Sequence, residues 1–209
     1  MEERLRNSSQ SQQNFLITHE SILVSPLCGR LATLLLTLAI AISTTLQFFF
    51  PVILRIFERD YTRFLAGDWW RLITPLFVQD GGIRGSIFNL VSLILVGIIA
   101  ERLWGSQRWL IIFFTGGILS ELIAFAWQPV GAGNSVANFS LAASLAVWCL
   151  TLNPSRPVRI AALLALGAGV LLLLFQDIHG IAMLLGAAIA LILIWSGRHN
   201  LRNKTKVLK

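Results

Sequence analysis

The sequence predicts an all-α membrane protein with six transmembrane helices and with both termini in the cytoplasm. Of its 209 residues, 56% are hydrophobic and only 13% are charged, whereas a soluble domain carries about 25% charged residues. The apolar residues gather in runs of roughly 17 to 25, the length that an α-helix needs to cross the hydrocarbon core. The basic residues gather in alternate connections between these runs, as membrane topology requires.

The first part of the chain combines a polar arm with a long apolar run. The arm covers residues 1–30, and the run covers residues 31–56. Because the run continues well past the small-residue pattern Ala39-Ile40-Ala41, we expect a retained helix rather than a cleaved signal peptide. A polar and aromatic connection follows over residues 57–85. Trp and Tyr collect at membrane interfaces, so this connection is expected to lie partly in the headgroup layer.

Five further apolar runs follow, separated by short connections rich in Gly, Pro, Asn and Asp, which are typical of chain reversals. Each run must be helical, because lipid cannot satisfy the hydrogen bonds of an extended backbone. The expected helices cover residues 86–103, 109–127, 134–152, 158–175 and 178–195. With the first run they form one membrane domain, residues 31–195, which is followed by a basic cytoplasmic tail, residues 196–209.

The positions of the 17 Lys and Arg residues set the expected orientation. Most of them fall in the arm, the inner turns and the tail, and the predicted outer segments hold only Arg55, Arg59, Arg63, Arg71 and Arg84. The net charge of +7 therefore indicates membrane topology and contact with anionic lipid, not nucleic acid. The two cysteines, Cys28 and Cys149, indicate neither a disulfide framework nor a metal pair.

Polar side chains inside membrane spans are costly and are therefore candidates for function. Asn89, Ser135, Asn138 and His179 are the clearest cases. With both termini inside, Asn89, Ser135 and His179 reach a similar depth below the outer surface. A serine hydroxyl needs a neighbouring base to act as a nucleophile, and an Asn amide can donate to an oxyanion. Together these three side chains would form a minimal acyl-transfer site.

A structural interpretation of the same residues stays open. Serine in a membrane helix usually bonds its own backbone, a histidine at a helix start is often interfacial, and Asn89 alone would more often join two packed helices.

Small residues favour close approach of the fourth and sixth spans, and Phe139 is expected to pack beside the imidazole of His179. These residues are Ser135, Ala142 and Ala146 in one span and His179, Ala182, Gly186 and Ala190 in the other.

Four charged residues each have two interpretations. Glu121, in the third span, could serve the site, but an interhelical hydrogen bond or snorkelling is favoured. Glu101, at an inner helix end near basic residues, is expected to be structural. Arg71 either bonds backbone carbonyls of the first connection or contacts lipid headgroups. Asp177 either orients His179 or caps the last helix, and its place on the turn favours the cap.

Several motifs resemble those of the rhomboid family of intramembrane serine proteases, over about residues 67–186. Each motif is weak alone, but their order and spacing agree with six spans. The motifs are GDWWRLITPLF from Gly67, Phe88-Asn89 with Gly97, Glu101 with Gly105-Ser106 and Arg108, GNSVANF from Gly133, and His179 with Ala182 and Gly186.

The resemblance implies a six-transmembrane-helix rhomboid-like bundle that acts as a serine endopeptidase on transmembrane segments of other membrane proteins, near the outer membrane face. Ser135 would be the nucleophile, and His179 would be the general base and then the general acid. Asn89, with the Ser135 backbone amide, would stabilise the oxyanion. Supporting positions would be Gly133, Phe139, Arg71, Ala182 and Gly186.

The same resemblance implies no metal, no organic cofactor and no particular oligomeric state. The expected partners are transmembrane protein substrates and the lipid bilayer, with no nucleic acid. The expected location is multi-pass in a bacterial-type plasma (inner) membrane.

Three residues depart from the family pattern. Val136 stands where Gly often follows the serine, and Gly85 stands where a histidine usually contributes to the oxyanion site. Ala182 stands in place of the sixth-helix glycine that is nearest to the histidine in the family motif. The loss of one oxyanion donor costs about 10²–10³ in rate. The alternative is therefore a catalytically weak or inactive rhomboid-like protein that binds transmembrane helices without cleaving them. A small transporter is less favoured, because neither internal repeats nor broken spans in matching halves are found.

Overall fold

The computed structural model describes residues 30–152 and 154–207, and most of them are helical. The predicted N-terminal arm, apart from Arg30, lies outside the described residues. Within this described part of the chain, five helices are long and apolar enough to cross a membrane, and a sixth, α7, is apolar but shorter at 17 residues. The six are α2 (Leu31–Phe49), α5 (Gly82–Trp104), α6 (Ser106–Ala124), α7 (Ser135–Thr151), α8 (Arg156–Leu174) and α9 (Ile178–Val207).

The first predicted span, residues 31–56, is wrong, because the chain forms two helices there. The helix α2 ends at Phe49, and a short helix, α3 (Val52–Phe57), follows it. Pro51 has no amide hydrogen and disfavours a helical conformation in the residue before it, so Phe50 adopts φ −128° and ψ 82° and interrupts the helix.

The other predicted spans correspond to single helices with shifted ends. The second helix begins at Gly82 rather than at residue 86, and the last continues to Val207 rather than stopping at residue 195. It therefore extends into the predicted basic tail. The remaining three helices begin and end within three residues of their predicted bounds.

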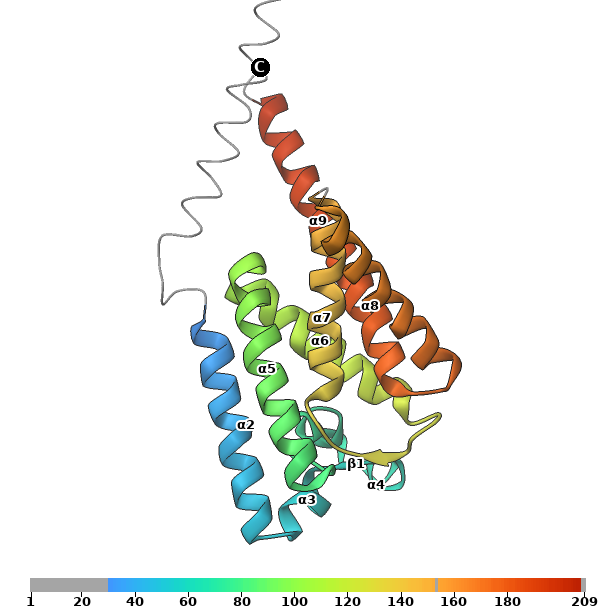
Figure 1. Cartoon of the computed structure of the whole chain (residues 1–209). Coiled ribbons are helices and arrows are strands. Elements are labelled where there is room, and N and C mark those ends of the chain that lie inside the picture. The colour runs from blue at the N-terminus through green and yellow to red at the C-terminus, as the bar shows by residue number, and fades with distance from the viewer. Residues whose placement is uncertain (1–29, 153, 208–209) are drawn as a thin grey trace, which may run out of the picture.

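The chain between α2 and α5 folds into short elements, which form a layer at one end of the bundle (Figure 1). They are α3, the strand β1 (Arg59–Asp60), α4 (Tyr61–Leu65) and two 3₁₀ helices, η1 (Trp69–Leu72) and η2 (Thr74–Phe77). The strand β1 pairs antiparallel with β2 (Val130–Gly131), which lies between α6 and α7. This pairing joins the connection between α2 and α5 to the connection that leads into α7.

The helix α7 occupies the centre of the bundle and contacts α5, α6, α8 and α9. Small residues allow this close packing. Gly186 of α9 lies directly against the backbone of Ser140, so that a methyl group at position 186 would overlap it. The Ser140 hydroxyl also donates to the Ala182 carbonyl oxygen (2.8 Å). The fourth and sixth predicted spans therefore do approach closely, and Ser140 lies at the contact.

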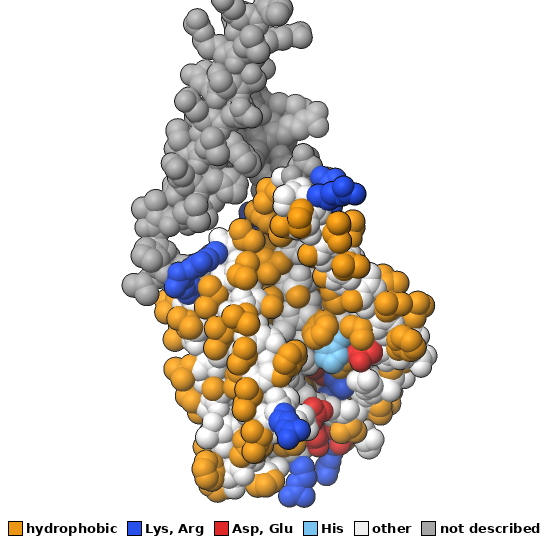
Figure 2. Space-filling model, in the orientation of Figure 1, with side chains coloured by type: hydrophobic (Ala, Val, Ile, Leu, Met, Phe, Trp, Pro, Cys, Tyr) orange, Lys and Arg blue, Asp and Glu red, His pale blue; other side chains and the backbone are white. Residues whose placement is uncertain are grey.

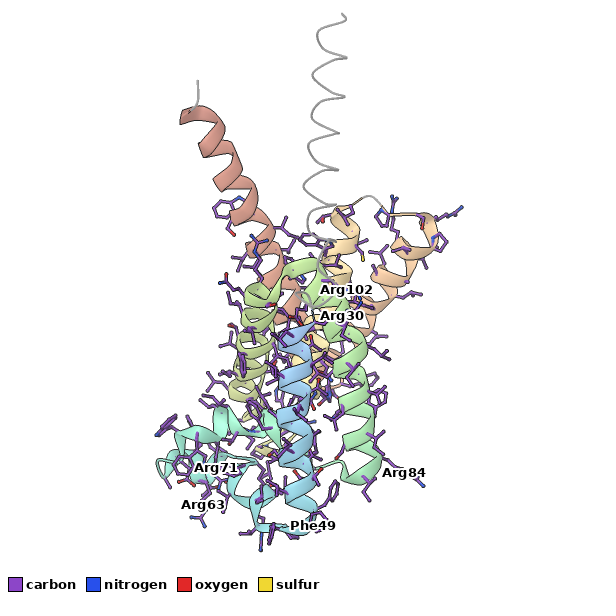
Figure 3. All side chains as sticks on the ribbon, turned by 90° about the vertical axis from the view of Figure 1, so that its left-hand side faces the viewer. Arg30, Phe49, Arg63, Arg71, Arg84 and Arg102 are labelled. Carbon is purple, nitrogen blue, oxygen red and sulfur yellow. The ribbon has the colours of Figure 1, made fainter. Side chains whose placement is uncertain are left out.

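Large apolar side chains cover the outside of the helices, and Figure 2 shows them over most of the visible face. Basic side chains lie toward the two ends. Figure 3 places Arg30 and Arg102 at one end of the bundle and Arg63, Arg71 and Arg84 at the opposite end. An apolar girdle between two charged ends is the surface that a membrane-spanning bundle requires.

Candidate active site

Ser135 is the first residue of α7, and a tightly held loop leads into it. The Gly133 amide donates to the Pro75 carbonyl oxygen (2.9 Å), and the Ala132 amide donates to a carboxylate oxygen of Asp80 (2.8 Å). Gly133 has a φ of +146°, a conformation that favours glycine. A Cβ at this position would lie 3.4 Å from Asn89 Nδ2, 3.4 Å from Gln79 Oε1 and 3.5 Å from Ser135 Oγ.

His179 is the second residue of α9, and its ring meets Ser135. The distance from His179 Nε2 to Ser135 Oγ is 2.9 Å, across 44 residues of sequence. Phe139, one turn after the serine, packs on the imidazole with 4.6 Å between the ring centres. On the far side of the ring, His179 Nδ1 lies 2.6 Å from Asp177 Oδ1. The serine and the histidine are thus within hydrogen-bonding distance, in the geometry that a general base needs.

Asn89 belongs to a network of amide side chains beside the serine. Its Nδ2 donates to Gln79 Oε1 (2.8 Å), and Gln79 Nε2 donates to Asn134 Oδ1 (2.7 Å). The Asn89 backbone carbonyl accepts from Asn138 Nδ2 (2.9 Å). An amide nitrogen carries two hydrogens, so the bond to Gln79 leaves one Asn89 donor for another acceptor. The network fixes the direction in which that donor points.

The sequence-based candidates included neither Gln79 nor Gln47, whose side chain bonds the backbone of Gln79. Gln79 and Gln47 are almost completely buried, at 1% and 5% exposure. Gln47 lies in the first apolar run, and the high cost of a polar side chain in lipid is the signal that could have identified it. Gln79 lies in a connection, where a Gln is common, so the sequence holds no comparable signal for it.

A polar cavity of about 160 Å³ opens beside Ser135 and His179. Arg59, Asp80 and Glu121 line its other side. Arg59 and Glu121 form a buried ion pair, with 2% and 1% of their side chains exposed, and Arg59 Nε also donates to the Gln128 carbonyl oxygen (2.8 Å). Figure 2 shows acidic and basic side chains gathered close to a histidine on a largely hydrophobic face.

The favoured interpretations of Glu121 were an interhelical hydrogen bond and snorkelling. The partner is instead Arg59 of the strand β1, and both side chains are buried. Arg59, counted among the basic residues of the predicted outer segments, is thus buried within the protein. A buried carboxylate and a buried guanidinium compensate each other's cost of desolvation, which explains their pairing.

Arg71 lies apart from the cavity at Ser135 and organises the first connection. Its guanidinium donates to the carbonyl oxygens of Arg55 (3.1 Å) and Glu58 (2.8 Å) and to the Asp68 carboxylate (3.1 Å). Burial raises the pKa of Glu58, and the charge of Arg71 opposes that rise. Of the two interpretations of Arg71, the bonds to backbone carbonyls are the one found.

Glu101 has a structural role at the opposite end of the bundle. Its carboxylate accepts from the amides of Ala32 (3.0 Å) and Thr33 (2.8 Å) at the start of α2, and from the Ser106 hydroxyl (2.7 Å). A carboxylate is stabilising at a helix N-terminus, where amide hydrogens are unpaired.

The three residues that depart from the family pattern differ in burial and in the space around them. Val136 is buried (1% exposed) and lines the cavity, and its backbone has no positive φ. Ala182 is fully buried, and its carbonyl accepts from Ser140. Gly85 has no atom within 4 Å of the place where a Cβ would stand.

Comparison with known proteins gives a consistent result. A family model described as the Rhomboid domain matches residues 66–200. Rhomboid protease GluP of Bacillus subtilis (strain 168) is 39% identical over 80 residues, which are 38% of this chain and 16% of that protein. Rhomboid protease AarA of Providencia stuartii is 33% identical over 75 residues, 36% of this chain and 26% of that protein.

Rhomboid-like protease 3 of Toxoplasma gondii is 30% identical over 87 residues, 38% of this chain and 33% of that protein. The chain thus spans no more than a third of the length of these three curated relatives.

Proposed function

This chain belongs to the rhomboid family and is an integral, multi-pass membrane protein, and on that premise we propose that it is a serine endopeptidase that cleaves transmembrane segments of other membrane proteins. The observation that carries the proposal is the 2.9 Å distance between Ser135 Oγ and His179 Nε2. The relatives named as proteases support it as well.

In the proposed reaction, Ser135 Oγ attacks the scissile carbonyl carbon while His179 Nε2 takes the hydroxyl proton. The resulting oxyanion accepts hydrogen bonds from the free Asn89 donor and from the Ser135 backbone amide, which is unpaired at the start of a helix. His179 then gives its proton to the leaving amine, and water hydrolyses the acyl-enzyme with the histidine again acting as base. The chemistry needs no metal and no organic cofactor.

The proposed topology has six spans with both termini in the cytoplasm and with the site near the outer face. It counts α7 as the fourth of the six spans, although this helix has only 17 residues, because the layer of short elements covers its N-terminal end. Two outer arginines support this orientation, since Arg59 pairs with Glu121, and Arg71 bonds carbonyls and Asp68. Both are thereby compensated within the protein, which lowers the uncompensated positive charge of the outer segments. A bacterial-type plasma (inner) membrane is the proposed location.

A rhomboid-like protein that binds transmembrane helices without cleaving them is the second candidate. The specific observation in its favour is Gly85, because a histidine at that position would add an oxyanion donor. The retained contact between Ser135 and His179 favours the protease, since binding alone needs no such pair.

The test is cleavage of a single-span substrate in reconstituted membranes. Wild type is expected to cleave, and Ser135→Ala to lose cleavage by at least about 10³-fold, because the nucleophile is gone. Ser144→Ala is the matched control, since Ser144 is a buried serine of the same helix that only bonds the Leu141 carbonyl (2.7 Å). Activity in the control but not in Ser135→Ala supports the protease. Absence of cleavage by wild type, with intact binding of the substrate helix, supports the second candidate.

A further inference from the structure

The turn between α8 and α9 sets the position of Asp177. Gln176 adopts a φ of +57°, which is rare for a residue with a side chain, and the Asp177 amide donates to the Leu172 carbonyl oxygen (2.9 Å). Asp177 then stands immediately before α9 and caps it, because its Oδ1 accepts from the His179 backbone amide (2.8 Å). The cap predicted from the sequence is therefore present.

Capping alone does not account for the second contact of the same oxygen. Asp177 Oδ1 also lies 2.6 Å from the ring atom Nδ1 of His179. Asp60 offers a comparison, because it caps α4 by accepting from the Arg63 amide (3.0 Å) without touching an ionisable ring. At Asp177 the carboxylate, the imidazole and the Ser135 hydroxyl instead form one line of contacts, through Nδ1 and then Nε2.

We propose that Asp177 is a positioning residue that extends the Ser135–His179 pair to three members, by holding the imidazole in the reactive orientation and stabilising its charged form. The inference rests on the proposed function. When Nδ1 donates its hydrogen to the carboxylate, Nε2 carries the free lone pair that accepts the serine proton. As that proton arrives, the ring becomes positive beside a negative oxygen, which lowers the energy of the charged state.

The other acidic groups near the ring are engaged elsewhere. Glu121 pairs with Arg59, and Asp80 accepts from the Ala132 amide. Phe139 covers a face of the imidazole without offering a charge. Among the described residues, Asp177 is thus the carboxylate that directly contacts His179.

The expected size of the effect follows from exposure. Loss of the aspartate in a buried Ser-His-Asp triad lowers kcat by about 10⁴. Asp177 and His179 have 36% and 27% of their side chains exposed, so water screens their interaction. We expect a loss of about 10- to 100-fold.

The experiment compares Asp177→Asn and Asp177→Ser with wild type in liposomes. Both replacements are good helix caps, but Asn removes the charge, and Ser is also too short to reach the ring. Two rates are measured: kcat for a transmembrane substrate, and the rate constant for labelling of Ser135 by a small fluorophosphonate. The labelling rate constant does not depend on the fraction of folded protein. Both rates are expected to fall about 10- to 100-fold in both variants, with KM within about twofold.

Asp60→Asn is the matched control, because it makes the same change at a different helix cap, and it is expected to keep both rates. If both Asp177 variants keep wild-type rates while Ser135→Ala is inactive, Asp177 is a cap only and the inference is wrong. If Ser135→Ala cleaves as well as wild type, the proposed function itself fails, and the inference fails with it.

Discussion

The Gln47 side chain of α2 makes two hydrogen bonds to the backbone of Gln79. Its Nε2 donates to the Gln79 carbonyl oxygen (2.5 Å), and its Oε1 accepts from the Gln79 amide (2.8 Å). The side chain of Gln79 in turn holds Asn89 and Asn134. The first long helix therefore positions the proposed oxyanion donor through one buried glutamine.

Gln79→Leu removes the acceptor that orients Asn89 while keeping the backbone bonds to Gln47. We expect kcat to fall about 10- to 100-fold, within the range for loss or misdirection of an oxyanion donor, with KM little changed. Steady-state cleavage in liposomes measures both constants. Gln107→Leu, at an exposed position of α6, is the control. A wild-type kcat in Gln79→Leu would show that Asn89 does not depend on this contact.

Gly133→Ala combines backbone strain with a methyl group placed between Asn89, Gln79 and Ser135. We expect cleavage to fall more than about tenfold, together with a loss of stability on the order of 1 kcal/mol. Gly105→Ala separates the two effects, because Gly105 also has a positive φ (75°) but has no atom within 4 Å of its Cβ position. The control should lose stability only. Equal activity losses in both variants would exclude a local role for Gly133.

Gly186→Ala forces a methyl group into the backbone of Ser140, at the contact that brings α7 and α9 together. We expect a melting temperature lower by several degrees, corresponding to about 1–3 kcal/mol of overpacking, and a parallel loss of Ser135 labelling by a fluorophosphonate. Gly167→Ala in α8 is the control, because its Cβ would meet no atom within 4 Å. If Gly186→Ala melts at the wild-type temperature, the close contact does not support the fold.

Glu121→Leu leaves the Arg59 guanidinium buried without its partner. Removal of one member of a buried ion pair costs about 3–5 kcal/mol, whereas replacement of both can be nearly neutral. We therefore expect Glu121→Leu to lower the free energy of unfolding by that amount, and the double variant with Arg59→Leu to recover most of it. Unfolding in mixed micelles measures all three proteins. A single variant within about 1 kcal/mol of wild type would argue against the pair.

Gly85→His tests whether the missing histidine limits the rate. A Cβ at this position has no atom within 4 Å, so the replacement begins in open space, one turn before Asn89 on the same helix. We expect kcat to rise up to about tenfold as a second side-chain donor reaches the oxyanion. Gly85→Leu controls for added bulk and should give no increase. An unchanged kcat in Gly85→His would mean that Gly85 does not limit catalysis.

The sequence by itself determined the order and the approximate positions of the long apolar helices. Runs of apolar residues must be helical in lipid, and Pro, Gly and Asn mark their ends closely, as at residues 134–152. The predicted end of the first span was wrong, because Pro51 interrupts this apolar run and α2 ends before it. The sequence also indicated Asn89, Ser135 and His179 as candidates, because polar residues in spans are rare and costly.

The tertiary structure decided which of these side chains meet. Whether Ser135 and His179 touch depends on the rotation and depth of two helices, which the packing of Ser140 against Gly186 sets. The roles of Gln79 and Arg59 depend on partners found far away in the sequence, at Gln47 and Glu121. A pattern along one chain records the cost of burying a polar group, but only the folded contacts show which partner compensates that cost.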